Sequence, residues 1–465
     1  MRHDSKDELQ TFLVDYAASL AYAQFSEDVV HVAKVRMIDT FSALLGGYSG
    51  KPCRIARNLA AQVTSKNNGA SVIGAGFKTS PEMAAFVNGS TARYVEMNDV
   101  YHRPGSFGGH PSDVVMPVFA AAEHVNANGR DLITALVLAY EIYMRITDEY
   151  QKGGFDHTNF CCLASAVAAG KLFGLNPEQM SHCISMAVVP NNSLRQVRLG
   201  HLSMYKAVAS GQAGRAGLFA ALQARAGMEG PHLPFEGEAG WFDHVAKKRI
   251  VPKEMGGSSV PFRIKDTLIK QRSSCATTIS SILAAEKVAP IRDLSQVKKV
   301  TVEVYKSAKE GMATGEHHWN PDSRETADHS IPYVTAATLI DGTLTPASFE
   351  DDHLKSPELR ALLSKIEVIS NDEFTHAYKQ MPVEHRTRIT VETTDGKRSV
   401  GEAGGKLGDL SEAKSDAQVE RKFQELSESL IGPQRVKATL DLLWDLDHLD
   451  DLTLIAQNTV ALAQQ

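Results

Sequence analysis

The stretch TNFCCLASAVAAGKLF (residues 158–173) combines an apolar helical pattern with a run of alanine and glycine. Small side chains let two helices approach closely, so this stretch indicates a helix at the centre of a compact bundle. Similar patterns predict further helices over residues 81–100, 113–126, 130–149, 177–189 and 205–227. We therefore expect the first 230 residues or so to form an all-helical unit.

The character of the chain changes after about residue 260. Val300, Val302 and Val304 alternate with polar residues, which is typical of a half-buried strand. Thr394-Asp395-Gly396 lies between two β-rich runs and predicts a hairpin. From about residue 415 the pattern is helical again. These observations predict a mainly α protein, in which a large all-helical domain carries an inserted, smaller α+β lid domain.

The expected boundaries follow from these changes in pattern. Residues 1–265 form the first part of the helical domain, residues 266–432 form the lid, and residues 433–465 return to the helical domain. The last helix is expected to begin at Pro433, because proline is compatible with the first position of a helix.

Composition narrows the classes of function. The 465 residues carry 49 lysines and arginines against 55 acidic residues, a net charge of −6, and show no basic patch. We therefore expect no nucleic-acid partner and no membrane partner. The N-terminus MRHDSKDELQ is polar, and no apolar run approaches the roughly 20 residues that span a bilayer. A cytoplasmic location is expected.

Cysteine spacing bears on cofactors. The five cysteines are dispersed and include no CxxC pair, so a structural zinc or an iron–sulfur cluster is not expected. The segment GAGFKT (residues 74–79) fails the dinucleotide fingerprint and lacks the spacing of a phosphate-binding loop. We expect catalysis by side chains alone, with no metal and no cofactor.

A first cluster of candidate residues lies in the segment EMNDVYHRPGSFGGHPSD (residues 96–113). It places Glu96, Asn98, Asp99 and His110 in and around a glycine-rich loop between two apolar helices. Loops on a rigid scaffold often carry active sites. A solvated loop would also explain the glycines and charges, and His102 taken alone suits a structural role.

A second cluster contains His157, at the start of an apolar helix, and the cations Arg195, Arg198 and Lys206. Several cations together can hold a polycarboxylate, and arginine forms paired hydrogen bonds with a carboxylate. The alternatives are a capping network around His157 and a solvated basic face. Lys206 begins an alanine- and glycine-rich stretch, which favours its burial.

A third cluster contains Arg324, His329 and Tyr333, with Lys270 near the domain junction. If a helix begins near Asp328, His329 and Tyr333 are four residues apart and share one face. Asp328 would then be an ordinary helix cap. The three clusters together supply the side chains needed for proton transfer on an anionic substrate.

At these segments the sequence resembles the MmgE/PrpD family, which includes 2-methylcitrate dehydratase, cis-aconitate decarboxylase and iminodisuccinate epimerase. The resemblance covers essentially the whole chain, including SPEMAAFVNG (residues 80–89) and RETADHSIPY (residues 324–333). It implies a helical domain with a smaller α+β lid, a homodimer, and a small polycarboxylate as substrate. The polar site residues that it implies are Glu96, Asn98, Asp99, His110, His157, Lys206, Lys270 and Tyr333.

The chain also departs from the family pattern. Glu96 stands where aspartate is common, and Val100 where threonine is common. In the decarboxylase branch a histidine follows the equivalent of Lys270 by five residues, whereas this chain has Cys275. The last difference argues against decarboxylation.

The resemblance and the residues together predict a cofactor-independent lyase of propionate metabolism that dehydrates 2-methylcitrate, or citrate, to the corresponding cis-aconitate. The alternatives are an epimerase, racemase or decarboxylase acting on a related acid, and a carboxylate-binding protein without activity. The expected catalytic residues are Asp99, His110, His157, Lys206 and Tyr333. The expected substrate-binding residues are Glu96, Asn98, Arg195, Arg198, Lys270, Arg324 and His329. Which histidine is the base and which the acid stays open at this point.

Overall fold

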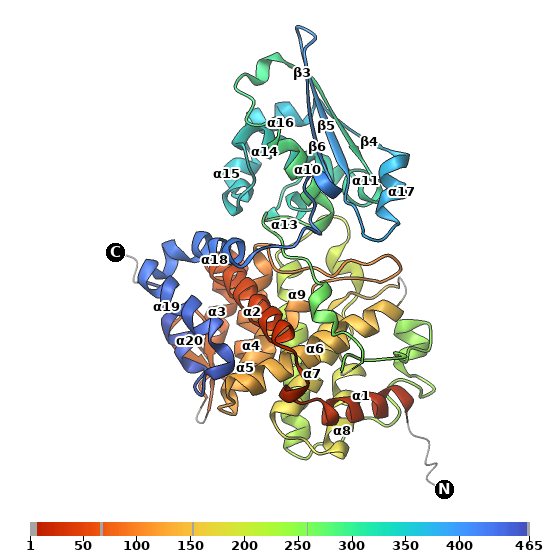
Figure 1. The fold of residues 1–465 in the computed structure, drawn as a ribbon, viewed down its shortest axis with the longest axis vertical. Coiled ribbons are helices and arrows are strands. Elements are labelled where there is room, and N and C mark those ends of the chain that lie inside the picture. Colours follow the sequence, from red (N-terminus) through yellow and green to blue (C-terminus); the bar gives the residue numbers. More distant parts are fainter. Residues whose placement is uncertain (1–6, 66–67, 151–152, 258, 463–465) are drawn as a thin grey trace.

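The structure is a computed structural model that describes residues 7–65, 68–150, 153–257 and 259–462. It is mainly helical, with a smaller α+β domain next to a helical one (Figure 1), which confirms the predicted fold class. The helices of the first domain are α1 (Glu8–Ser19), α2 (Glu27–Gly47), α3 (Lys51–Ala60), α4 (Pro81–Tyr94), α5 (Val115–His124), α6 (Gly129–Glu149), α7 (Thr158–Leu172), α8 (Pro177–Val188) and α9 (Tyr205–Arg225). A short hairpin of β1 (Ala70–Val72) and β2 (Phe77–Thr79) lies between α3 and α4.

Close packing of α9 against α4 and α7 forms the centre of this domain. A Cβ atom added at Gly211 would overlap Ser90 Oγ and the Phe86 carbonyl oxygen of α4. One added at Gly217 would overlap the Cys162 carbonyl oxygen of α7. The small residues therefore allow the helix contacts that the sequence indicated.

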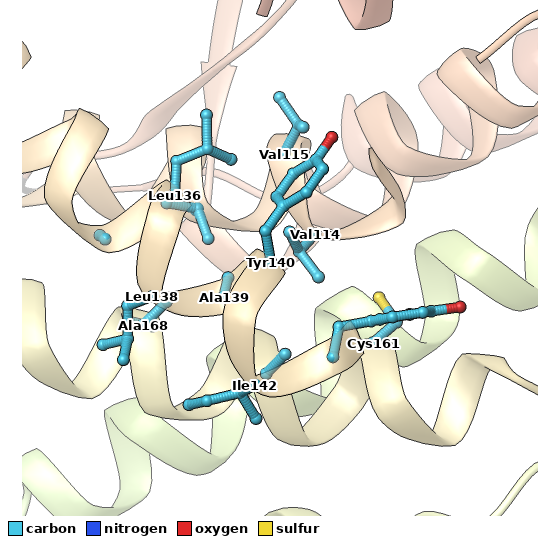
Figure 2. Packing of buried hydrophobic residues seen from close by; sticks show 14 of the residues in the cluster. Val114, Val115, Leu136, Leu138, Ala139, Tyr140, Ile142, Cys161 and Ala168 are labelled. Carbon is cyan, nitrogen blue, oxygen red and sulfur yellow. The ribbon is translucent and has the colours of Figure 1, made fainter. Parts of the chain in front are cut away.

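The apolar core continues between α5, α6 and α7. Figure 2 shows Val115, Leu136 and Ile142 among the tightly packed side chains, with Cys161 in the same cluster. Four of the five cysteines are buried, and Cys275 alone is partly exposed.

Helix α4 ends earlier than expected. The pattern predicted a helix over residues 81–100, but α4 stops at Tyr94, and Glu96 has a left-handed backbone with φ of +54°. This conformation is uncommon for a residue with a side chain. It turns the chain inward, so the Glu96 side chain is completely buried.

The α+β domain has a core of its own, separate from that of the helical domain. Its four-stranded sheet has the order β4-β3-β5-β6, with β3 parallel to β4 and antiparallel to β5. The strands are β3 (Val297–Val304), β4 (Ile366–Ser370), β5 (Thr387–Thr393) and β6 (Arg398–Ala403), and the predicted turn at Gly396 joins the last two. The helices are α10 (Ala276–Glu286), α11 (Lys306–Met312), α12 (Glu316–Trp319), α13 (Arg324–Ala327), α14 (Ile331–Asp341), α15 (Asp351–Leu354), α16 (Pro357–Leu363) and α17 (Asp372–Tyr378).

The chain returns to the helical domain before the expected residue 433. Helix α18 (Asp416–Ile431) packs along α2, and its apolar residues Val419, Phe423 and Ile431 belong to the helical core. The inserted segment therefore ends before residue 416, not at residue 432. Two further helices follow, α19 (Pro433–Trp444) and α20 (Thr453–Asn458).

A buried lysine fixes α18 in place. Lys422 Nζ donates to Asp39 Oδ1 of α2 at 2.6 Å and to the carbonyl oxygens of Met97 and Lys270 at 2.6 and 2.9 Å. Both charged side chains are almost fully shielded from solvent. Lys422 thus joins α2 and α18 to the segment that leads into the α+β domain.

A chain of hydrogen bonds forms a second link between the domains. Asp409 Oδ1 accepts from His385 Nδ1 at 2.9 Å, and His385 Nε2 lies 3.0 Å from His102 Nδ1. His102 Nε2 in turn lies 2.5 Å from the Tyr378 hydroxyl. His102 belongs to the loop after α4, whereas its partners belong to the α+β domain, so the histidine has the structural role that its residue type favoured.

No helix in the described part of the chain is both long enough and apolar enough to cross a membrane.

Replacing Lys422 by methionine should destabilise the protein by about 3–5 kcal/mol, because it leaves the Asp39 carboxylate buried without its cation. Urea unfolding followed by circular dichroism measures the loss. Lys437→Met is the matched control, since Lys437 forms an exposed pair with Asp441 on α19 and should cost less than about 0.5 kcal/mol. Equal effects of the two substitutions would contradict the tethering role of Lys422.

Candidate active site

A cleft between the two domains is lined by four of the predicted site residues, His157, Arg195, Arg198 and His329. Its larger part has a volume of about 600 Å³ and is lined from the helical domain by the 105–109 loop, Asp156, His157 and the two arginines Arg195 and Arg198. Met312 and His329 line it from the α+β domain. A second part of about 330 Å³ shares both arginines, Met312 and His329. Both domains therefore contribute walls to the cleft.

Glu96 is the centre of a buried ion cluster behind this cleft. Its carboxylate accepts from Arg93 Nη1 at 2.5 Å and from Lys270 Nζ at 2.8 Å, and it lies 3.0 Å from Lys206 Nζ. Burial alone would raise the pKa of Glu96, but these cations hold it well below its usual range. Glu96 is therefore ionised and its oxygens are occupied by protein cations.

Lys206 extends this ion cluster from the helical domain to the α+β domain. Its Nζ donates to both carboxylate oxygens of Asp328, at 2.7 and 2.9 Å, and lies 3.1 Å from His329 Nδ1. Lys206 and Asp328 are both buried. Lys206 therefore contacts Glu96 of the helical domain and Asp328 of the α+β domain at once, and its ammonium group stabilises the junction.

His329 is the member of this cluster that lines the cleft. Burial and the charge of Lys206 lower its pKa, whereas Cys275 and Asp328 raise it, and the balance is a pKa of about 9. His329 is therefore an imidazolium at neutral pH. It places a positive charge on the α+β side of the cleft.

His110 has a defined tautomer. Its Nδ1 lies 2.7 Å from the carbonyl oxygen of Asp99, which can only accept, so Nδ1 carries the proton. Burial and the nearby Arg93 hold the pKa of His110 well below its usual range, so the ring is neutral. The unprotonated Nε2 lies 3.6 Å from the Glu96 carboxylate, and His110 is not among the residues that line the cleft.

His157 has the opposite tautomer. The Tyr143 hydroxyl accepts from the backbone N–H of His110 at 3.1 Å and can donate its own proton to His157 Nδ1, also at 3.1 Å. The proton of His157 then sits on Nε2. Burial lowers the pKa of His157 to about 3, so this ring is neutral as well. The two rings lie 5.4 Å apart between centroids, one able to accept a proton and the other to donate one.

Arg198 has an open hydrogen-bonding edge. Its Nε donates to Asp156 Oδ2 at 2.8 Å, while Nη1 and Nη2 are buried and have no hydrogen-bond partner within the described residues. Arg198 lines both parts of the cleft, and Arg195 lies beside it. An arginine that is held by one carboxylate and has two further donors without a partner suits a carboxylate of a bound ligand.

Asn98 and Asp99 lie beside the site but face other protein groups. The Asp99 carboxylate accepts from the Ser112 backbone N–H at 2.9 Å and from the Tyr140 hydroxyl at 3.1 Å. Asn98 accepts from Arg93 and donates to Ser112 Oγ. Both residues shape the loop that carries His110. Lys270 is likewise buried behind the cleft, where burial lowers the pKa of its ammonium group.

Tyr333 and Arg324 are not brought to the cleft. The Tyr333 hydroxyl donates to the Ser348 carbonyl oxygen at 2.7 Å, inside the core of the α+β domain. Tyr333 lies in α14, whereas His329 lies in the turn between α13 and α14. The two side chains therefore do not share one face of a helix. Arg324 donates to Ser273 Oγ and stacks on Tyr94, so it joins the domains without lining the cleft.

Sequence reasoning missed three residues of the site. Arg93 stands three residues before Glu96, a helix pairing distance that could have indicated an ion pair. Tyr143 looked like an ordinary core residue of α6, and only its three-dimensional position reveals its hydroxyl contacts. Asp328 was interpreted as a helix cap, although its carboxylate binds Lys206.

Within the described residues, no group of three or more His, Cys, Asp or Glu side chains is arranged to hold a metal ion.

Comparisons with known proteins agree with this organisation. The MmgE/PrpD N-terminal domain matches residues 11–253, and the MmgE/PrpD C-terminal domain matches residues 273–446. A cis-aconitate decarboxylase of Aspergillus terreus is 26% identical, over 97% of this chain and 95% of the relative. A 2-methylcitrate dehydratase of Escherichia coli is also 26% identical, over 83% of this chain and 82% of the relative. The human cis-aconitate decarboxylase is 23% identical, over 94% of this chain and 91% of the relative.

The opposite tautomers of the two histidines can be observed by nitrogen NMR on histidine-labelled protein, with His110→Gln and His157→Gln assigning the signals. Both rings should stay neutral between pH 8 and pH 5, with the proton on Nδ1 in His110 and on Nε2 in His157. In Tyr143→Phe the proton of His157 should no longer be confined to Nε2. The matched control Tyr140→Phe, which removes a hydroxyl bound to Asp99, should leave the tautomer of His157 unchanged. If both histidines carry the proton on the same ring nitrogen, or if either ring titrates near pH 6.5, there is no basis for assigning one as base and the other as acid.

Proposed function

The chain belongs to the MmgE/PrpD family, and from this premise we propose that it is a lyase that dehydrates a tricarboxylate, most readily 2-methylcitrate and more slowly citrate. The proposal is carried by two neighbouring neutral histidines, of which His110 has its proton on Nδ1, next to an arginine with two donors that lack a partner within the described residues. Dehydration needs a base for a carbon-bound proton, an acid for the leaving hydroxyl, and cations for the carboxylates.

In the proposed reaction, His110 Nε2 accepts the proton from the carbon next to a carboxylate. His157 Nε2–H gives its proton to the departing hydroxyl, which leaves as water, and the electron pair of the broken C–H bond forms the new double bond. Arg198 holds one carboxylate, while Arg195 and the His329 imidazolium offset the charge of the others. Each proton-transfer group of this kind contributes about 10²–10⁴-fold to the rate.

Decarboxylation of a cis-aconitate is the second candidate reaction, since cis-aconitate decarboxylases are among the relatives. In the decarboxylase branch of the family that the sequence resembles, a histidine stands at the position of Cys275. This difference favours dehydration here. An epimerase or racemase would use the same two histidines on a dicarboxylate. A carboxylate-binding protein would use the arginines but would not need a matched base and acid.

We also propose that the protein is a homodimer and that it is cytoplasmic, as its sequence leads us to expect. Light scattering on the purified protein tests the first, and imaging of a tagged copy in its own cell tests the second.

Purified protein should convert 2-methylcitrate, and citrate more slowly, into a product with the ultraviolet absorbance of a new conjugated double bond. Conversion should continue in EDTA, because the donor groups of the described residues form no metal-binding set. Release of carbon dioxide from cis-aconitate would favour the decarboxylase, and loss of optical activity by a dicarboxylate would favour the epimerase. Binding of these acids without any turnover would leave only the carboxylate-binding protein.

Two substitutions should separate binding from chemistry. Arg198→Gln should raise KM about 10–100-fold, since a charge-assisted hydrogen bond contributes about 1.5–3 kcal/mol. His110→Gln should lower kcat about 10²–10⁴-fold. The matched control is His448→Gln, because His448 lies on the surface in an exposed pair with Asp445. If the control lowers turnover as much as His110→Gln does, the assignment of His110 as the base fails.

A further inference from the structure

The smaller part of the cleft has walls that differ from those of the larger part. Both parts share Arg195, Arg198, Met312 and His329, but only the larger part is lined by His157. The larger part, of about 600 Å³, is by itself within the range of about 300–1,000 Å³ that pockets for small ligands occupy. The smaller part, of about 330 Å³, is therefore additional room beyond the shared cations. We call it the side chamber, and its own walls come from the segments 199–202 and 310–318 and from Thr326.

The charge of the side chamber does not suit another carboxylate. Among the described residues, those that line only this chamber include no lysine or arginine, and their one carboxylate is that of Glu310, whose side chain is largely exposed. Burial lowers the pKa of His318 to about 4, and burial and His201 lower the pKa of His317, so both rings are neutral at pH 7. An anionic group inside the chamber would meet Glu310 without a cation beyond those at the entrance.

The polar groups of these walls already have partners within the protein. Thr326 Oγ1 accepts from the backbone N–H of Leu202 at 3.0 Å, and Thr314 Oγ1 donates to a backbone carbonyl oxygen at 2.8 Å. His318 Nδ1 accepts from a backbone N–H at 3.2 Å. The chamber therefore offers a ligand few free hydrogen-bonding groups.

Apolar side chains supply most of the remaining contact surface. Leu199, Leu202 and Met312 line the chamber, and Leu199 leaves 47% of its surface exposed. Gly311 also lines it, and a Cβ atom added there would meet no atom within 4 Å. Covering exposed apolar surface with an uncharged alkyl group is favourable, because it removes that surface from water.

We propose that the side chamber binds an alkyl chain longer than methyl, so that the substrates include 2-alkylcitrates with ethyl and propyl chains. This inference rests on the proposed function, whose site it extends. In 2-methylcitrate the methyl group and one carboxylate are attached to the same carbon. When the cations shared by both parts hold that carboxylate, a longer chain on the same carbon starts at the entrance of the side chamber. The chain keeps all its bonds, and the reaction is the same loss of water.

Binding of unreactive analogues tests the chamber without any turnover. Butane-, pentane- and hexane-1,2,3-tricarboxylate carry the methyl, ethyl and propyl chains but no hydroxyl group, so they cannot be dehydrated. Isothermal titration calorimetry on the full-length protein measures their affinities. Affinity should rise about fourfold for each added methylene. An affinity that stays constant or falls from the methyl to the propyl analogue would overturn the proposal.

A substitution that fills the chamber tests its location. Gly311→Leu places a side chain in the open space of the chamber and should reduce the preference for the propyl over the methyl analogue about tenfold or more, because the chain loses its room. The matched control is Lys306→Leu, which adds a leucine to the same helix, α11, at an exposed position outside the chamber. The control should keep the wild-type preference. An equal preference in Gly311→Leu and in the wild-type protein would show that the chain binds elsewhere.

Turnover of 2-methylcitrate and 2-propylcitrate then separates this inference from the proposed function. The propyl substrate should have the higher kcat/KM, and Gly311→Leu should reverse the order. If affinity rises with chain length but neither acid is dehydrated, the chamber stands and the proposed function fails. If 2-methylcitrate is dehydrated but affinity does not rise with chain length, the proposed function stands and the chamber fails. If none of the tricarboxylates binds, both are overturned.

Discussion

Burial of the Glu96 carboxylate at the junction of the two domains is the constraint on which the rest of the structure depends. Burying an ionised carboxylate costs several kcal/mol unless cations and hydrogen bonds compensate for the lost water. Here Arg93, Lys206 and Lys270 reach it from α4, α9 and the segment before α10. Because the three cations come from separate parts of the chain, the Glu96 carboxylate joins the end of α4, the helical bundle and the domain junction.

The same cluster divides the cleft into two electrostatic halves. On the helical side, burial and the nearby cations keep His110 neutral. On the α+β side, Asp328 accepts from Lys206 of α9, and Cys275 and Asp328 raise the pKa of His329. The helical wall thus contains His157 together with Arg195 and Arg198, whereas the α+β wall contributes the positive charge of His329.

Much of this arrangement could be predicted from local patterns, and the rest could not for identifiable reasons. Alanine and glycine content located the central helices, and strand alternation located the sheet. The assignment of α18 to the helical core depends on its packing against α2, some 380 residues earlier in the chain, which no local pattern reports. Helical spacing placed Tyr333 with His329, but spacing does not determine the direction of a side chain beyond a turn. Arg93 was missed because a charged residue inside a predicted helix is usually expected to face solvent.

The division between the walls also bears on how one scaffold can support different reactions. His110 is oriented by a backbone carbonyl, and His157 by a hydroxyl from the middle of α6, so neither can be changed without repacking the helical core. His329 and Cys275 lie on short connections just outside helices, where a substitution alters charge with less effect on packing. If His110 and His157 transfer protons as proposed, the helical core fixes their positions, whereas the charge on the α+β wall can change with less effect on that core.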